Sequence, residues 1–163
     1  MAAFGEVIYA TPGYPPDPDA DPEWAIRVAN HKAGRPASWR TVETTDLVGV
    51  LADADAPVLV DCLGTWMTRV LDTLDAWELP AGEAAALAER EIAELAAGLA
   101  ACEQPVTVVT NEVGWGLVPP YASGRLFSDL LGRTNQEVGA VCDEVHVVVS
   151  GRVLVLTDSI RTR

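Results

Sequence analysis

One short segment gathers side chains whose types could carry chemistry. Residues 30–43, NHKAGRPASWRTVE, hold His31, the chain's single lysine Lys32, and the guanidinium groups of Arg35 and Arg40. A neutral imidazole can attack phosphorus, and nearby cations can offset the charge that develops on a transferring phosphoryl group. Taken alone, His31 is more typical of a surface residue that complements the negative end of a helix. The segment therefore indicates a nucleophile with phosphate contacts or, alternatively, a cationic surface feature.

Polar residues also follow two apolar runs that resemble strands. In the run PVLVDCL, Asp61 follows the apolar residues Val58 to Val60, where a carboxylate is typical either of a Mg²⁺-associated aspartate or of a cap on the next helix. Asn111 and Glu112 follow the run PVTVVT and are expected at the same edge of the sheet. His146 alternates with valines and is expected to be an ordinary strand residue.

The composition narrows the class of protein. A net charge of −13 argues against a binder of nucleic acid or of anionic membranes, because the summed field repels polyanions. No apolar run reaches the roughly 18–20 residues of a membrane span, and the first residues do not resemble a signal peptide. The three widely spaced cysteines do not form a zinc or redox motif. An odd cysteine count is typical of a reducing cytoplasm, so we expect a cytoplasmic protein.

The elements that must position these groups follow from hydrophobic periodicity. Apolar and β-rich runs predict strands at 6–10, 57–63, 105–110, 144–150 and 152–156, the middle ones covered on both faces of a parallel sheet. Helical patterns occupy the intervals at 22–32, 64–77, 82–101 and 124–142.

Three local signals refine this pattern. Asp21 and Pro22 predict a helix start, and Gly34 is a plausible terminator of that helix. Ser150–Gly151 predicts a hairpin that closes the sheet with an antiparallel edge. Segment 30–43 is expected to leave the core as a loop, because glycine and proline interrupt it. Residues 11–22, rich in proline and aspartate, are expected to form a surface loop within one α/β domain spanning residues 1–163.

Several stretches together resemble one family. HKAGRPASWRTVE, VLVDCLGTWMTRVL, VTNEVGWGLVPPYASGRLFSDLLGRTNQEV and DEVHVVVSG are similar to adenosylcobinamide kinase/adenosylcobinamide-phosphate guanylyltransferase, the bifunctional enzyme of cobalamin nucleotide-loop assembly. The similarity runs from about residue 6 to residue 156, and the order N-E-V-G, V-P, R-x-F-x-D, G-R-x-N-Q is its most specific part.

The resemblance implies a P-loop NTPase-like (RecA-like), mostly parallel sheet, a homotrimer, and ATP or GTP as substrates with Mg²⁺. It implies phosphorylation of adenosylcobinamide, then transfer of GMP from GTP through a histidine–GMP intermediate at His31. Asp61 is implied as a nucleotide and metal position. The other implied nucleotide contacts are Ala10, Thr11, Pro12, Lys32, Ala33, Gly34, Arg35 and Glu43.

One departure from the family accompanies the resemblance. Family members open with a strand, a loop of the G-G-x-x-S-G-K-S kind and a helix, and we expect this first unit to be missing before the strand at 6–10. A start codon placed too far downstream, a genuinely shortened homologue and a fragment are three competing explanations. The leading hypothesis is a nucleotide-dependent transferase; the alternative is a catalytically impaired homologue that serves as a corrinoid-binding or oligomerisation module. Trp115 is a candidate for stacking on a large planar ligand or for packing.

Overall fold

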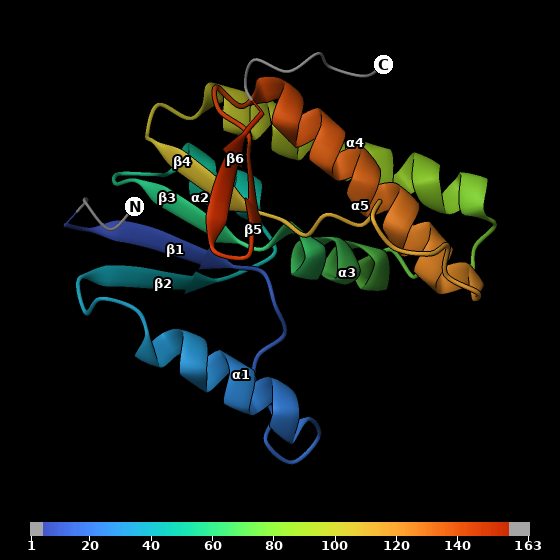
Figure 1. Ribbon diagram of the computed structural model, residues 1–163, viewed down its shortest axis with the longest axis horizontal. Coiled ribbons are helices and arrows are strands. Elements are labelled where there is room, and N and C mark those ends of the chain that lie inside the picture. Colours follow the sequence, from blue (N-terminus) through green and yellow to red (C-terminus); the bar gives the residue numbers. More distant parts are fainter. Residues whose placement is uncertain (1–4, 157–163) are drawn as a thin grey trace.

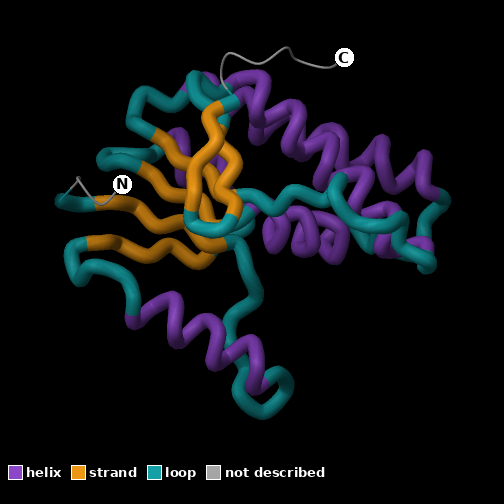
Figure 2. Tube along the Cα trace, in the orientation of Figure 1, coloured by secondary structure: helices purple, strands orange, loops and turns teal. Residues whose placement is uncertain are grey.

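A four-stranded parallel sheet lies at the centre of the computed structural model, which describes residues 5–156. Its strands follow the order β2-β1-β3-β4 (Figures 1 and 2). They are β1 (Val7–Thr11), β2 (Trp39–Glu43), β3 (Val58–Asp61) and β4 (Val106–Val109). Because the strands are parallel, their carboxyl ends meet at one edge of the sheet. Thr11, Glu43 and Asp61 are the last residues of their strands and therefore lie along that edge.

Strand β2 corrects the expectation that segment 30–43 is a loop beyond the helix that holds His31 and Lys32. Gly34 and Pro36 precede the strand, and from Trp39 to Glu43 the chain pairs in parallel with β1. Aromatic and β-branched residues favour this conformation. Trp39 and Val42 are half-buried while the other three side chains are exposed, as expected for an outer strand of the sheet.

Strand β4 is less covered than its continuous apolar sequence predicts. Val106 and Val108 are half-buried and pack against the core, while Thr107 and Val109 are exposed. The two faces of the strand therefore have different surroundings, and the prediction of burial on both faces is wrong for β4. In β3, the other middle strand, Val58 and Val60 are buried and Leu59 is half-buried. The strand with the most complete burial is β1, where Val7, Ile8, Tyr9 and Ala10 are all buried.

Five helices lie in the described part of the chain, and four of them were predicted. Helix α1 is capped by Asp21, whose carboxylate accepts from the Trp24 amide at 2.9 Å. The unpredicted helix α2 is short and is capped in the same way by Asp46. No helix among residues 5–156 is long and apolar enough to cross a bilayer. The bounds are α1 Pro22–Ala33, α2 Leu47–Ala52, α3 Leu63–Thr73, α4 Ala81–Ala101 and α5 Ala122–Val141.

The core lies between the sheet and the helices α2 to α5. Helices α4 and α5 lie side by side, and α3 packs against both (Figure 1). Helix α1 has no buried residue and lies away from the other helices, beyond β2 (Figure 1). The core side chains with the least exposure include Val58, Leu47, Met67, Leu71, Leu95 and Leu131. Helix α1 therefore contributes no buried side chain to the core. His31 lies in its last turn, so the position of His31 depends on contacts at that end of the helix.

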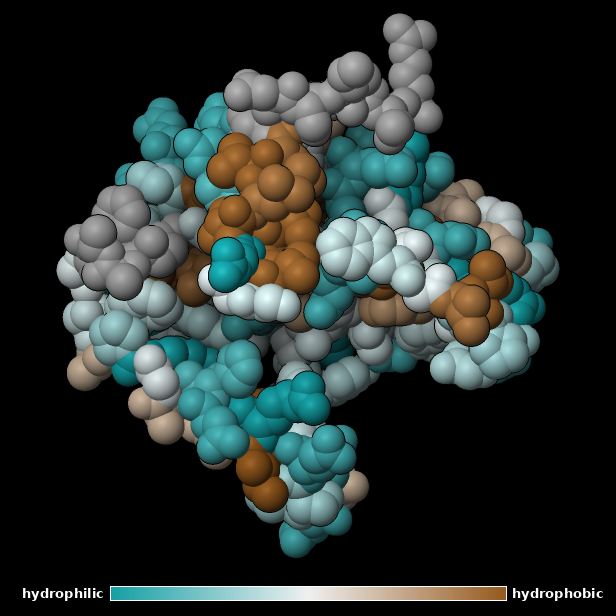
Figure 3. Space-filling model, viewed as in Figure 1, coloured by the Kyte–Doolittle hydropathy of each residue, from teal (hydrophilic) through white to brown (hydrophobic). Residues whose placement is uncertain are grey.

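A C-terminal hairpin forms as predicted but pairs only with itself. Strands β5 (His146–Val149) and β6 (Arg152–Val155) are antiparallel and form a sheet separate from β1–β4. Ser150 and Gly151 both have positive φ, of 52° and 71°, which suits a tight two-residue turn. The expectation that the hairpin extends the main sheet is therefore wrong. Its valines and leucine stay largely exposed and form an apolar surface over the hairpin (Figure 3).

Candidate active site

The last turn of α1 brings His31 to the carboxyl edge of the sheet. Its Nδ1 lies 3.6 Å from Oδ2 of Asp61, within ion-pair range and longer than a hydrogen bond. The His31 side chain is 57% exposed, whereas that of Asp61 is 24% exposed. An accessible imidazole beside a sheltered carboxylate is an arrangement that suits a nucleophile, because the carboxylate can orient the ring.

Tyr9 contacts the same oxygen of the Asp61 carboxylate as His31. Its hydroxyl donates a hydrogen bond to Oδ2 of Asp61. The side chain is only 5% exposed. Burial, and then the neighbouring Asp61, raise the pKa of Tyr9 to about 12. The phenol therefore remains a protonated donor at neutral pH.

The segment after α1 folds over the Tyr9 ring. The Arg35 guanidinium carbon lies 3.6 Å from the ring centroid, a cation–π contact. The Trp39 ring is stacked with a centroid separation of 6.2 Å. Arg35 also donates from Nη1 to the Thr41 hydroxyl at 3.1 Å. Its buried Nε has no hydrogen-bond partner within the described residues. These contacts tie the predicted cationic segment to β1 and β2.

Lys32 forms an ion pair with Glu43 across the edge of the sheet. Its Nζ lies 2.8 Å from Oε1, and the two side chains are 48% and 42% exposed. Such exposed pairs contribute little stability, roughly 0–1 kcal/mol, so either partner can exchange for a ligand at small cost.

The remaining predicted contacts differ in how accessible they are. Ala10 and Pro12 are buried, whereas Thr11 is half-buried and its carbonyl accepts from the Thr44 amide at 3.2 Å. Ala33 and Gly34 are exposed, and Gly34 ends the helix as predicted, with its amide bonded to the Asn30 carbonyl. Of Ala10, Thr11 and Pro12, Thr11 is the one that is not buried.

Asn111 and Glu112 follow β4 as predicted, but each accepts a hydrogen bond from a nearby residue of the protein. The Asn111 carbonyl accepts from Asn135 of α5 at 3.0 Å, and Asn135 also accepts from the Thr110 hydroxyl at 2.6 Å. Glu112 accepts from the Gly114 amide at 2.7 Å. The G-R-x-N-Q motif therefore supplies, through Asn135, an anchor for the loop after β4.

Trp115 lies farther along that loop. Trp115 is 72% exposed, so it is not packed in the core of the described chain.

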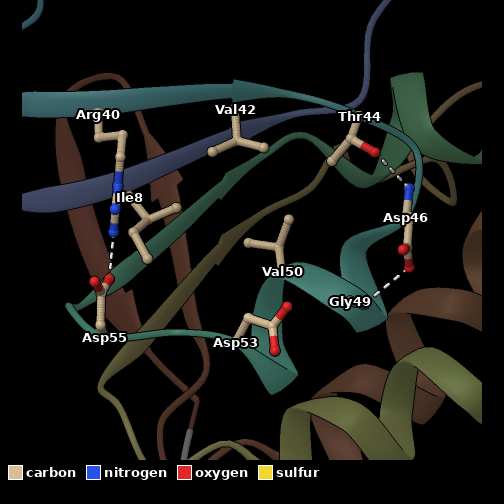
Figure 4. Close-up of a pocket in the computed structure, with 9 residues that line it drawn as sticks. All are labelled: Ile8, Arg40, Val42, Thr44, Asp46, Gly49, Val50, Asp53 and Asp55. Atoms are coloured by element: carbon tan, nitrogen blue, oxygen red, sulfur yellow. Dashed lines mark hydrogen bonds and ion pairs between the residues drawn. The ribbon is translucent and has the colours of Figure 1, made fainter.

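A separate hollow of about 390 Å³ lies between β1, β2 and α2 (Figure 4). Arg40, one of the cations predicted to contact phosphate, lines this hollow and so lies apart from the His31 cluster. Asp46 caps α2, and Asp55 forms an ion pair with Arg40 on its rim (Figure 4). These polar groups already have partners, and the His31 cluster remains the candidate site.

Sequence reasoning missed Tyr9, the residue that organises the cluster. Tyr9 was assigned only to a strand, and its partner Asp61 lies 52 residues away. A hydroxyl-bearing aromatic two residues before the end of a buried strand was the available signal, because such a side chain seeks a polar partner when buried.

A parallel sheet flanked by helices, with reactive groups at its carboxyl edge, defines a layered α/β protein and is consistent with a P-loop NTPase-like fold. The chain belongs to the cobinamide kinase / cobinamide phosphate guanyltransferase family, whose model matches residues 2–156.

Curated relatives agree with this membership. The chain is 42% identical over 141 residues to the bifunctional adenosylcobalamin biosynthesis protein CobU of Salmonella typhimurium, covering 80% of this chain and 77% of the relative. It is 40% identical to the CobU protein of Escherichia coli with the same coverage. It is 36% identical over 135 residues to CobP of Pseudomonas aeruginosa, covering 80% of this chain and 73% of the relative. The sequence-based recognition of the family is confirmed.

Proposed function

We propose that this chain is bifunctional, phosphorylating adenosylcobinamide with ATP or GTP and then transferring GMP from GTP to the phosphorylated product. Membership of the family carries this proposal, and the relatives named above are themselves described as bifunctional. The comparisons favour this enzymatic function over a non-catalytic binding or oligomerisation module. The kinase reaction rests on family membership alone, whereas the guanylyl transfer is also supported by the geometry around His31.

In guanylyl transfer, His31 would act as the nucleophile. A ring nitrogen donates its lone pair to the α-phosphorus of GTP and forms a P–N bond. The bond from that phosphorus to the bridging oxygen breaks, and pyrophosphate leaves with the electron pair. The phosphate group of adenosylcobinamide phosphate then attacks the same phosphorus and returns the electron pair to the ring nitrogen. Splitting the transfer into two steps is the usual advantage of covalent catalysis.

The surrounding residues would bind the nucleotide. Lys32 can release Glu43 and neutralise phosphate oxygens, since their ion pair is exposed. Arg35 already lies beside the site through its contact with Tyr9. We propose the full set of nucleotide contacts as Ala10, Thr11, Pro12, Lys32, Ala33, Gly34, Arg35, Glu43 and Asp61.

Asp61 fits a Mg²⁺ ion of the kind that accompanies nucleoside triphosphates. Among residues 5–156 no group of three or more acidic, histidine or cysteine side chains could hold a metal ion. Mg²⁺ in nucleotide sites commonly takes one or two carboxylates and otherwise phosphate and water. Tyr9 and His31 both face Oδ2 of Asp61, which leaves Oδ1 for such an ion. The ion would offset phosphate charge during transfer.

We further propose a homotrimer in the cytoplasm. The support is the family resemblance together with a loop that exposes apolar side chains, with Leu117 97% and Val118 79% exposed. The cysteines, none of them in a disulfide within the described chain, agree with a reducing compartment.

The test is to incubate the full-length protein with GTP that is radiolabelled in its α-phosphate. We expect a protein-bound label that is labile in acid and stable in alkali, as for a phosphoramidate. His31→Ala should abolish it. His146→Ala is the matched control, because the chain has two histidines and His146 lies in the exposed hairpin, beside Glu144. Label that persists in His31→Ala contradicts the assignment of the nucleophile.

A further inference from the structure

We infer that Tyr9 is a positioning residue for guanylyl transfer: through Asp61 it fixes the Nδ1 side of His31, so that Nε2 forms the bond to phosphorus. The inference rests on the proposed role of His31 as guanylyl acceptor. It assigns a function to a side chain that touches neither the nucleotide nor the corrinoid in the proposed reaction.

The sheet register brings Tyr9 and Asp61 together. Tyr9 is paired with Leu59 on the neighbouring parallel strand, and Asp61 lies two residues beyond Leu59. Because side chains alternate along a strand, Leu59 and Asp61 point to the same face as Tyr9. The phenol therefore reaches one step toward the carboxyl edge and donates to Oδ2 of Asp61.

The phenol itself is held from several sides. It is 5% exposed, the Arg35 guanidinium covers one part of the ring, and Trp39 is stacked against it. A side chain packed in this way has one position, so its hydroxyl fixes the carboxylate it donates to. Without that hydrogen bond, the Asp61 carboxylate could rotate away from the imidazole.

His31 needs such a partner because its ring is more than half exposed. The 3.6 Å separation between Nδ1 and Oδ2 places the carboxylate on one specific nitrogen. A carboxylate facing one ring nitrogen favours the tautomer that carries the hydrogen there, and the lone pair then lies on the other nitrogen. The tautomer we infer for His31 therefore carries the hydrogen on Nδ1 and the lone pair on Nε2.

The Nδ1–H tautomer determines where the electrons and the proton go when His31 takes GMP from GTP. Nε2 donates its lone pair to the α-phosphorus, and pyrophosphate leaves with the electrons of the broken P–O bond. The hydrogen on Nδ1 stays in place, and Asp61 offsets the positive charge that the ring acquires. The product is an Nε2 phosphoramidate.

The nitrogen that carries GMP is measured directly on the wild-type full-length protein. We expect NMR of protein labelled with nitrogen-15 in histidine, after reaction with GTP, to show coupling of phosphorus to Nε2. Coupling to Nδ1 would overturn the inference, and this result does not depend on any variant folding.

The role of Tyr9 is measured with Tyr9→Phe, which keeps the ring and removes the hydroxyl. Loss of a side chain that orients a metal-bound histidine typically costs about 10–100-fold in metal affinity or activity, and we take the same range for an oriented imidazole nucleophile. We expect the rate of His31 guanylylation to fall within that range, with the KM for GTP unchanged within about twofold and some Nδ1 product appearing.

Tyr14→Phe is the matched control. Tyr14 also donates its hydroxyl to a carboxylate, that of Asp72, but it is 48% exposed and lies on the loop after β1. We expect the rate of His31 guanylylation in Tyr14→Phe to equal that of the wild-type protein. If Tyr9→Phe reacts as fast as Tyr14→Phe while the wild type becomes labelled normally, the inference is wrong and the proposed function stands. If the wild-type protein takes no label, both the inference about Tyr9 and the proposed guanylyl transfer at His31 are wrong.

Discussion

Raising the pH should remove part of the stabilisation that Tyr9 provides, and the size of the effect follows from its pKa. The pKa of Tyr9 is raised from 10.0 to about 12 in the folded protein, first by burial and then by Asp61. Below about pH 10 the phenol is protonated in both the folded and the unfolded chain, so its contribution is complete. Above pH 10 the unfolded chain loses this proton while the folded protein keeps it. Stability therefore falls as the pH rises toward 12.

The magnitude can be worked out from the shift. Two pKa units at about 1.36 kcal/mol each give about 2.7 kcal/mol for the whole titration. Roughly half of this, about 1.4 kcal/mol, is lost by about pH 11, one unit above the unfolded pKa. The hydrogen bond to Asp61 should give the wild type an advantage of about 1–2 kcal/mol over Tyr9→Phe at neutral pH. The two proteins should therefore have nearly equal free energies of unfolding near pH 11.

The assay is urea unfolding of the wild type and Tyr9→Phe at about pH 8 and about pH 11, in metal-free buffer. Tryptophan fluorescence reports unfolding, and Trp39 lies against the Tyr9 ring. Comparing the two proteins cancels the titration of every other group. With a urea dependence of roughly 2 kcal/mol/M, the difference between their midpoints should shrink by about 0.7 M. An unchanged difference between pH 8 and pH 11 would refute the assignment of Tyr9 as a buried donor to Asp61.

Two further predictions concern the loop after β4 and the assembly. Asn135→Ala should lower the free energy of unfolding by about 1–2 kcal/mol, because it removes the hydrogen bonds to Asn111 and Thr110. The control is Gln136→Ala, at an exposed neighbouring residue, which should lower the free energy of unfolding by less than about 0.5 kcal/mol. Equal urea midpoints for the two variants would contradict the role of Asn135 as an anchor of the loop. Sedimentation equilibrium of the full-length protein should give the mass of three chains, and a single-chain mass would exclude the proposed trimer.

Much of the fold could be predicted because its signals are local. The Asp21–Pro22 start of α1 and the Ser150–Gly151 turn each depend on a few adjacent residues, and both appear in the structure. Strand β2 was missed because Gly34 and Pro36 dominate the segment before it, while its pairing partner β1 is distant in sequence. Tertiary pairing decided the outcome over local propensity.

The candidate site could be predicted only in part for the same reason. The grouping of His31 with Lys32 and Arg35 could be seen in the sequence, because these residues lie within one short segment. The strand-end position of Asp61 followed from the apolar run before it. Which groups face one another depends on the sheet register, which no short pattern encodes. The links from Tyr9 to Asp61 and from Lys32 to Glu43 both cross between elements and therefore required coordinates.

The ion pair between Lys32 and Glu43 also makes the protein unusually simple to probe chemically. Lys32 is the single lysine of the chain, so its Nζ is the one side-chain amine an acylating or methylating reagent can modify. It follows His31 directly and lies 2.8 Å from Glu43. A nucleotide that occupied the site would change the reactivity of this amine. The extent of modification at Lys32, measured on the peptide that contains it, would then report occupancy in the whole population.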